Sequence, residues 1–190
     1  MESLIYKKLD GKKVKCNICN HFCVIKDGKR GICGVRENKD GQLLSLVYPK
    51  VIASSIDPIE KKPIFHLKPG SYSYSIATVG CNFKCAFCQN SNIAHMPQNR
   101  NGLIQGKDLS PESIVTEAVR TGCDSISYTY TEPTVFSELV LETAKLAKDQ
   151  GLLNIMVTNG YMSIKLLKML SPYLDAANVD LKAFDDDFYK

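Results

Sequence analysis

The 190-residue chain carries 24 Lys and Arg against 20 Asp and Glu, a net charge of +4, and 44% of its residues are hydrophobic. This composition is ordinary for a globular protein, and no apolar run approaches the roughly 18 residues that span a bilayer, so we expect no membrane association. The first ten residues lack the apolar core of a secretory signal. We therefore expect a cytoplasmic protein whose eight cysteines bind metals rather than form disulfides.

Positive charge is concentrated at the start of the chain. Residues 1–39 hold ten Lys and Arg against four Asp and Glu, a net charge of +6, which leaves −2 for residues 40–190. A basic surface attracts anionic partners, but few aromatic side chains are interleaved with these charges. We interpret the segment as a solvated basic face and do not expect a nucleic-acid partner.

A first group of cysteines lies within this basic segment. It comprises Cys16, Cys19, Cys23 and Cys33. Four thiolates at this spacing, with glycines that permit tight turns between them, suit either a structural zinc site or an accessory iron–sulfur cluster, and the spacing does not choose between them. His21 is a possible substitute for one thiolate, although we expect it to be a bystander. A segment this small buries little core, so a bound metal is its expected source of stability.

Residues 41–72 are expected to form a connector. Residues 42–48 have the pattern of a strand, and residues 57–70 hold three prolines and a terminal glycine, which is typical of a loop. This loop either lies across the mouth of an active site and presents Lys61, Lys62 or His66 to a ligand, or simply packs through its apolar residues. We expect two parts, a cysteine-rich module with its connector (1–70) and a core (71–190).

A second group of cysteines, Cys81, Cys85 and Cys88, follows an apolar run, 75–79, with the composition of a buried strand. The C-x3-C-x2-C spacing lets one loop present three thiolates to three corners of a cubane iron–sulfur cluster. Because the loop has no fourth cysteine, one iron is expected to bind a substrate or cofactor directly. The alternatives are a zinc site completed by His95 and a plain electron-transfer cluster.

Strands and helices alternate from residue 71 onward. Apolar patterns, serine caps and terminal glycines predict strands at 75–79, 125–130, 152–157 and 177–181, and helices from Pro111 to Gly122, from near Pro133 to Gly151, and from Ile164 to Leu170. Repeated units of this kind imply an α/β fold with a parallel sheet and right-handed crossovers. The remaining cysteine, Cys123, is expected to be a buried apolar residue.

Polar residues follow these strands at their carboxyl ends, where the active sites of parallel α/β folds lie. The cysteine loop follows the first strand, Glu132 the second, Asn159 the third, and Asp180 and Lys182 the fourth. Alternation places Asp180 and Lys182 on one face of their strand. These groups beside three cysteines suit a zwitterionic ligand better than a buried ion-pair network, because burying such a network is costly.

Four segments, taken in order, carry a family resemblance. They read Asp57-Pro-Ile-Glu-Lys-Lys-Pro-Ile-Phe-His, Gly80-Cys-Asn-Phe-Lys-Cys-Ala-Phe-Cys-Gln-Asn, Tyr128-Thr-Tyr-Thr-Glu-Pro and Val179-Asp-Leu-Lys-Ala-Phe. Together they resemble the radical S-adenosylmethionine (SAM) enzyme of the AmmeMemoRadiSam system, a family similar to the pyruvate formate-lyase activating enzymes. The N-terminal cysteine group fits the former family better than the latter.

The resemblance implies a [4Fe–4S] cluster on the three loop cysteines, with SAM bound at the open iron. The implied SAM-binding residues are Phe87, bordering the adenine, Glu132, facing the methionyl amine, and Asn159, Asp180 and Lys182. The implied reaction is reductive cleavage of SAM to a 5′-deoxyadenosyl radical, which abstracts hydrogen from a protein or small molecule that the sequence does not name. An electron donor such as flavodoxin or ferredoxin is the expected partner.

Radical SAM barrels usually contain more βα units than the four predicted here. We therefore expect a partial barrel whose C-terminal units are missing, joined to the small N-terminal module, and a truncated chain of low activity. Two other functions stay open. One is activation of a glycyl-radical enzyme, and the other is a non-catalytic zinc or iron–sulfur module.

Overall fold

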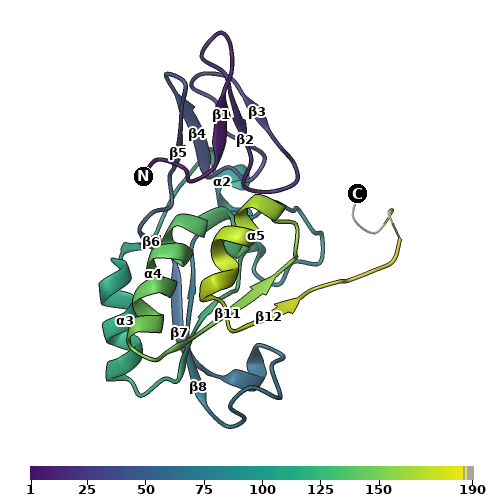
Figure 1. Ribbon diagram of the computed structural model, residues 1–190. Helices are drawn as coiled ribbons and strands as arrows, with labels where there is room; N and C mark the ends of the chain where they lie inside the picture. The colour runs from purple at the N-terminus through teal and green to yellow at the C-terminus, as the bar shows by residue number, and fades with distance from the viewer. Residues whose placement is uncertain (186, 188–190) are drawn as a thin grey trace.

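The computed structural model describes residues 1–185 and 187 and is built on a five-stranded sheet (Figure 1). In the order β12-β11-β10-β8-β7, the strands span Ala176–Val179, Leu153–Thr158, Ser125–Tyr128, Tyr72–Ala77 and Ala53–Pro58. The first four are parallel, and β7 runs antiparallel to β8. The expectation of an α/β fold with a parallel sheet is therefore confirmed.

The central strands are buried almost throughout. All four residues of β10 and all but the first of β8 are buried, as expected for parallel strands that are covered on both faces. Ile76, Tyr128 and Met156 are in register across β8, β10 and β11. Because these strands end at the same level, the loops that follow them leave the sheet at one common edge.

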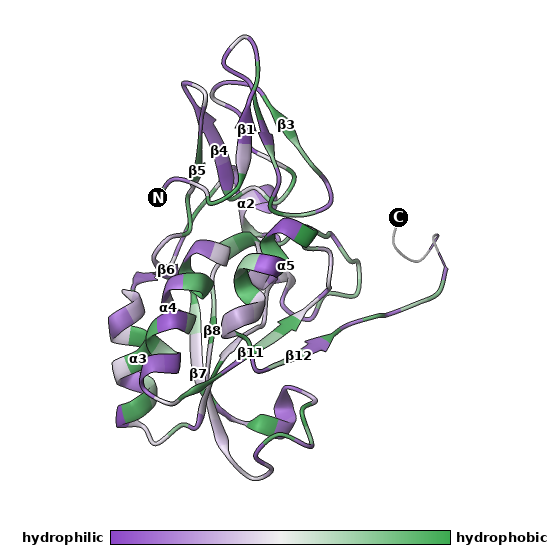
Figure 2. Ribbon diagram, viewed as in Figure 1, coloured by the Kyte–Doolittle hydropathy of each residue, from purple (hydrophilic) through white to green (hydrophobic). Residues whose placement is uncertain are grey.

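Three helices lie on one side of the sheet: α3 (Pro111–Arg120), α4 (Ser137–Asp149) and α5 (Ile164–Leu170) (Figure 1). Ser110 and Ser163 cap α3 and α5, each accepting a hydrogen bond from a backbone N–H of the first turn, as the sequence predicted. Figure 2 shows hydrophilic and hydrophobic bands on α3, and its buried residues include Ile114, Val115 and Ala118. This is the pattern of a helix with one face against the sheet.

The helix predicted from Pro133 to Gly151 is divided. Residues Pro133–Phe136 form a 3-10 turn, η2, and α4 begins at Ser137. The other short helical elements are η1 (Ile59–Lys61), α1 (Ser91–Ala94), α2 (Met96–Asn99) and η3 (Ser171–Tyr173). Within the part of the chain that the structure describes, every helix is too short or too polar to cross a lipid bilayer.

Residues 1–51 form small antiparallel sheets beyond one end of the central sheet, at the top of Figure 1. They contain β1 (Tyr6–Lys8), β2 (Val14–Cys16), β3 (Val24–Ile25), β4 (Arg36–Lys39), β5 (Gln42–Ser45) and β6 (Lys50–Val51), which pairs with β9 (Lys107–Asp108). β5 is the strand predicted at 42–48, and it ends earlier. Val14 and Val35 belong to the same apolar core as Ile76 and Leu139, so these sheets are packed onto the rest of the molecule.

The connector contributes an edge strand that the sequence did not predict. β7 pairs with β8 from Ala53 opposite Ala77 to Pro58 opposite Tyr72. Much of β7 is exposed, including Ser54 and Ser55, so its sequence lacks the apolar signal of a buried strand. It covers the edge that β8 would otherwise expose. Because it runs antiparallel to β8, with Pro58 opposite Tyr72, the loop that follows it starts at the amino end of β8.

Candidate functional site

The loop that follows β8, residues 80–90, carries the second group of cysteines. It begins with Gly80, whose φ of +98° is a conformation that favours glycine. A Cβ on Gly80 would lie 2.4 Å from Val35 Cγ1 and 3.2 Å from the carbonyl oxygen of Cys33. The N-terminal segment is therefore packed directly against the residue that precedes Cys81.

One cavity of about 630 Å³ lies beside this loop, at the carboxyl ends of the parallel strands. Its lining includes all eight residues that the sequence singled out for a cluster and SAM: Cys81, Cys85, Phe87, Cys88, Glu132, Asn159, Asp180 and Lys182. The convergence follows from the common level at which β8, β10 and β11 end. The volume is in the range of small-molecule binding sites.

Glu132 lines this cavity although its exposed fraction is only 2%. Its Oε1 accepts hydrogen bonds from Thr134 N at 3.0 Å, Thr134 Oγ1 at 2.6 Å and Thr158 Oγ1 at 2.7 Å. Its Oε2 accepts one from Asn159 N at 2.8 Å. Burial raises the pKa of Glu132, and these hydrogen bonds offset part of the rise. The carboxylate is thus fixed between the ends of β10 and β11, and Oε2 keeps the larger remaining acceptor capacity.

Asp180 and Lys182, which follow β12, form an ion pair. Lys182 Nζ lies 3.1 Å from Asp180 Oδ2, while Asn178 Nδ2 donates to Asp180 Oδ1 at 2.9 Å. The Asp180 and Lys182 side chains are 37% and 47% exposed, so the pair lies at an open part of the cavity. A pair this exposed contributes only about 0–1 kcal/mol to stability, which argues against a purely structural role.

A polar group from the connector meets the same cavity. Asp57 accepts hydrogen bonds from Lys61 Nζ at 2.7 Å, Lys62 Nζ at 2.5 Å and the hydroxyl of Tyr130. Burial alone would raise the pKa of Asp57, but hydrogen bonds from Lys61, Lys62 and Tyr130 outweigh it and hold the pKa below its ordinary value. Lys61 and Lys62 line the cavity, but the loop that carries them starts beside Tyr72, at the amino end of β8, and not across the mouth of the site as one expectation had it. His66 is exposed and lies outside the lining.

Asn82, to which no sequence motif pointed, connects the two cysteine groups. Its Oδ1 accepts a hydrogen bond from Asn159 Nδ2 at 2.8 Å and lies 3.8 Å from Cys81 Sγ. Its backbone carbonyl accepts a hydrogen bond from His21 Nε2 at 2.9 Å. His21 therefore links the N-terminal segment to the cysteine loop.

The four N-terminal cysteines surround a second and much smaller cavity of about 10 Å³, which Arg36 also lines. Cys16 ends β2, Cys19 and Cys23 lie on the turn before β3, and Cys33 precedes β4. Burial raises the pKa of Cys16 to about 12 and also raises the pKa of Cys19 and Cys33, while the charge of Arg36 opposes each rise.

Neither group of thiols forms a ready site for a single metal ion. Over residues 1–185 and 187, no three His, Cys, Asp or Glu side chains form a group that could hold a single metal ion. A cubane cluster needs a wider arrangement, because its thiolates bind different irons. Burial raises the pKa of Cys81 to about 12 and raises that of Cys85, so a metal that binds these sulfurs has to displace their protons. His95, the alternative ligand, lines neither cavity.

The chain is similar in sequence to known proteins. The family model of the radical SAM superfamily matches residues 75–190. The chain is 47% identical over 189 residues to an uncharacterized protein of Methanocaldococcus jannaschii and spans 55% of that protein. Over 117 residues, about 60% of this chain, it is 30% identical to an M. jannaschii protein named as a glycyl-radical enzyme activating enzyme and 26% identical to the pyruvate formate-lyase-activating enzyme of Clostridium pasteurianum. It spans 40% and 46% of these two proteins, so the chain covers about half the length of the relatives it matches.

Proposed function

The chain belongs to the radical SAM superfamily, and from this premise we propose that it cleaves SAM reductively on a [4Fe–4S] cluster and uses the product to abstract hydrogen from a substrate. The observation that carries the proposal is the convergence of three loop thiols and the polar strand ends around one cavity of about 630 Å³. When bound, the cluster and SAM supply an electron and a 5′-deoxyadenosyl radical, while the protein supplies ligation and orientation.

The residues present fit these two groups. Three soft thiol donors on one loop, Cys81, Cys85 and Cys88, suit the irons of a cluster. The cavity that they line also contains the buried carboxylate of Glu132 and the partly exposed pair that follows β12. These groups complement the amino and carboxylate ends of a methionyl moiety, and the cavity volume is adequate for a nucleoside-sized ligand.

Glu132 would receive the methionyl amine. Its Oε1 is already held by three donors and its Oε2 by the backbone N–H of Asn159, so the carboxylate is oriented before a ligand arrives. An amine N–H that donates to the carboxylate Oε2 makes a charge-assisted hydrogen bond, which is roughly twice as strong as a neutral one. Asn159, which also bonds to Asn82 in the cysteine loop, keeps this acceptor in a fixed relation to the loop.

The remaining side chains would hold the other parts of SAM. Phe87 is exposed within the lining and offers an aromatic face to the adenine. Asp180 and Lys182 offer one acceptor and one cation for the ribose and the carboxylate. The electron would come from a small carrier such as flavodoxin or ferredoxin, and the substrate is a protein or a small molecule.

The test is SAM cleavage by the chain itself. After anaerobic reconstitution with iron and sulfide and reduction with dithionite, we expect SAM to yield 5′-deoxyadenosine and methionine in equal amounts. Cys88→Ala should abolish this activity. Cys123→Ala, which removes a buried thiol that lines neither cavity, should retain it. A chain that holds its cluster but forms no 5′-deoxyadenosine would contradict the proposal.

Two of the matched relatives favour a narrower function, because they are named as activating enzymes. In that case the hydrogen would come from the Cα of a glycine in a partner enzyme, which leaves a glycyl radical and 5′-deoxyadenosine. Electron paramagnetic resonance should then show a backbone radical only when the partner is present. Continued formation of 5′-deoxyadenosine without that radical would exclude the partner tested and leave SAM cleavage standing.

A further inference from the structure

We infer that the end of the larger cavity opposite the cysteine loop is a substrate subsite, which binds a carboxylate or phosphate group through Lys61 and Lys62. Both lysines line this cavity, and both donate hydrogen bonds to Asp57 of the edge strand β7. The assignment to the substrate rests on the function proposed above, which places the cluster and SAM beside the loop cysteines. The anion site itself depends only on the contacts of these side chains.

The two lysines lie deep in the cavity, away from the loop at the carboxyl ends of the strands. Asp57, to which they bond, pairs with Ser73, four residues before β8 ends at Ala77. At about 3.3 Å per residue, this is roughly 13 Å along the strand from the end that leads into residues 80–90. The cavity therefore extends from the cysteine loop toward the amino ends of the strands, and its two ends are far enough apart to hold different groups.

Tyr130 connects this inner end to the cysteine loop. Its φ of +62° is a conformation that bulky residues rarely adopt. Asn90 Nδ2, in the cysteine loop, donates to the carbonyl oxygen of Tyr130 at 2.8 Å, and the Tyr130 hydroxyl donates to Asp57. Lys62 Nζ lies 4.8 Å from the centre of the Tyr130 ring. Strained backbone of this kind is concentrated at ligand sites, and here it holds the ring against Lys62.

The inner end carries more positive than negative charge. Lys61 and Lys62 share the single carboxylate of Asp57, which is the only acidic side chain that pairs with either lysine within the described residues. Although burial opposes it, hydrogen bonds hold the pKa of Asp57 below its ordinary value, so the carboxylate is ionised at neutral pH and one positive charge is left over. The other acidic residues of the lining are Glu132, which is fixed between β10 and β11, and Asp180, which has its own lysine partner.

Lys62 also has donor capacity left inside the molecule. Its side chain is only 2% exposed, and an ammonium group has three N–H donors. Across residues 1–185 and 187, Asp57 Oδ2, at 2.5 Å, is the only acceptor that bonds to Lys62 Nζ. Burial lowers the pKa of Lys62 even though Asp57 opposes the fall, so one carboxylate does not fully compensate the buried charge. An oxygen of an anionic ligand would supply the missing acceptor.

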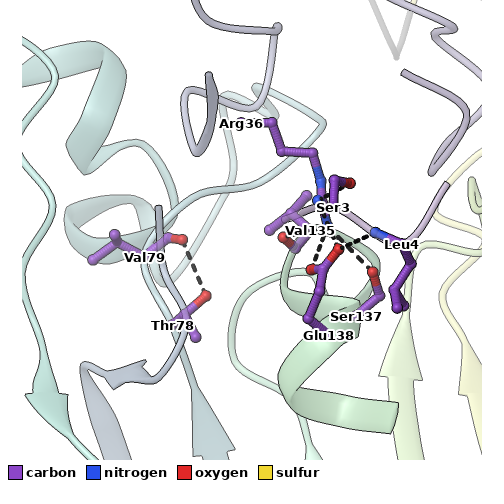
Figure 3. A network of polar contacts seen from close by, with 8 residues as sticks. All are labelled: Ser3, Leu4, Arg36, Thr78, Val79, Val135, Ser137 and Glu138. Carbon is purple, nitrogen blue, oxygen red and sulfur yellow. Dashed lines mark hydrogen bonds and ion pairs between the residues drawn. The ribbon is translucent and has the colours of Figure 1, made fainter. Parts of the chain in front are cut away.

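The buried pair of Arg36 and Glu138 shows the balanced case (Figure 3). One cation meets one carboxylate there, and both side chains are buried. Nη1 of Arg36 donates to Glu138 and to Ser3 Oγ, and Nη2 donates to Glu138, Val135 O and Ser137 Oγ. Neither member of this pair lines the larger cavity. The excess of positive charge is thus found at the buried group that borders the cavity, where a ligand can reach it.

Binding of small anions to the chain without cluster or SAM tests the inference. ¹⁵N-labelled protein is titrated with inorganic phosphate or with acetate, against sodium chloride of equal ionic strength. We expect saturable shifts of the backbone amide resonances of Lys61, Lys62 and Tyr130 with at least one anion, and the anion that binds identifies the class of the substrate group. Shifts confined to the surroundings of Lys182, or no saturable shift, would overturn the inference. Because SAM is absent, this result and the SAM cleavage assay can fail independently.

Two variants with opposite expected effects separate an anion site from a purely structural network. Lys62→Met should weaken binding of the same anion about tenfold or more, since a hydrogen bond to a charged group is lost. Asp57→Asn should strengthen it about tenfold, because the anion no longer competes with a carboxylate for both lysines. Lys68→Met, in the same loop at an exposed pair with Asp124, is the control and should bind normally. Unchanged affinity in Lys62→Met, or no gain in Asp57→Asn, would show that the lysines serve only the fold.

Discussion

Gly80 lets the start of the cysteine loop pack closely against the N-terminal segment, because it has no Cβ. Its φ of +98° resembles the +69° of Gly122, but a Cβ on Gly80 would meet Val35 and Cys33, whereas nothing lies within 4 Å of a Cβ on Gly122. Both alanine substitutions carry a backbone cost of about 1–2 kcal/mol. Overpacking should cost Gly80→Ala about 1–3 kcal/mol more. Urea unfolding of the two variants measures the difference, and equal losses would contradict the proposed packing.

Glu132→Gln tests the oriented carboxylate. Glu132 accepts a backbone N–H on each oxygen, from Thr134 on Oε1 and from Asn159 on Oε2. In either orientation, the amide nitrogen of Gln would therefore face a donor. We expect the affinity for SAM to fall about tenfold or more, since one lost hydrogen bond to a charged group is worth about 1.5–3 kcal/mol. Equilibrium dialysis with reconstituted protein measures it. Glu117→Gln, at an exposed pair with Arg120, should bind normally, and equal affinities would exclude the role of Glu132.

Site residues that belong to local motifs could be predicted from the sequence, whereas contacts between residues far apart in the chain could not. The cysteines and Glu132 were identified because spacing and strand ends carry chemical information in the sequence. Arg36 and Glu138 are 102 residues apart, and Asn82 and Asn159 are 77 apart. No local pattern joins such pairs, because their contact exists only after the sheet and the N-terminal segment have packed together.

At the scale of elements, local signals predicted the starts of α3 and α5, but they predicted neither the division of the helix expected from Pro133 nor the strand β7. Ser163 and the apolar spacing predicted α5 with its observed bounds, Ile164–Leu170. The helix expected from Pro133 begins with a separate 3-10 turn, where the Glu132 side chain accepts from Thr134 N. β7 was missed because its pairing with β8, rather than its own apolar pattern, makes it a strand.

The pair formed by Arg36 and Glu138 joins the N-terminal sheets to α4. Both side chains are buried, with exposed fractions of 2% and 0%. Removing one partner of such a pair leaves an uncompensated charge and typically costs about 3–5 kcal/mol. We expect Glu138→Gln to lower the free energy of unfolding by this order, as measured by urea unfolding. The exposed pair of Glu117 and Arg120 serves as the control, where Glu117→Gln should cost at most about 1 kcal/mol. If both variants lost a similar free energy of unfolding, the buried pair would not be a main contact between the N-terminal sheets and α4.

The same pair makes stability depend on pH. Burial alone would raise the pKa of Glu138, but the charge and hydrogen bonds of Arg36 outweigh it and hold the pKa below the ordinary value of 4.5. Because the folded state has the lower pKa, this stabilisation is present above about pH 4.5 and is lost as the pH falls further. Below pH 4.5 the free energy of unfolding should therefore decline more steeply in the wild type than in Glu138→Gln. Parallel pH profiles would contradict this assignment.

At the scale of the whole molecule, two cysteine sites meet at one loop. The larger cavity lies on the strand-end side of residues 80–90, and the smaller cavity lies in the N-terminal segment that packs against Gly80 and bonds to Asn82. The α/β class and the parallel sheet followed from the repeated βα pattern. The closeness of the two sites could not be foreseen, since it depends on how residues 1–51 pack on the sheet.

The central claim is that one iron of the loop cluster has no protein ligand and binds SAM directly. Electron–nuclear double resonance on the reduced, reconstituted chain tests it with SAM labelled by ¹⁵N in the amino group and ¹⁷O in the carboxylate. We expect hyperfine coupling of both labels to the cluster spin, and loss of both couplings in Cys88→Ala. A reduced cluster that shows no coupling to either label while SAM is bound would contradict the account.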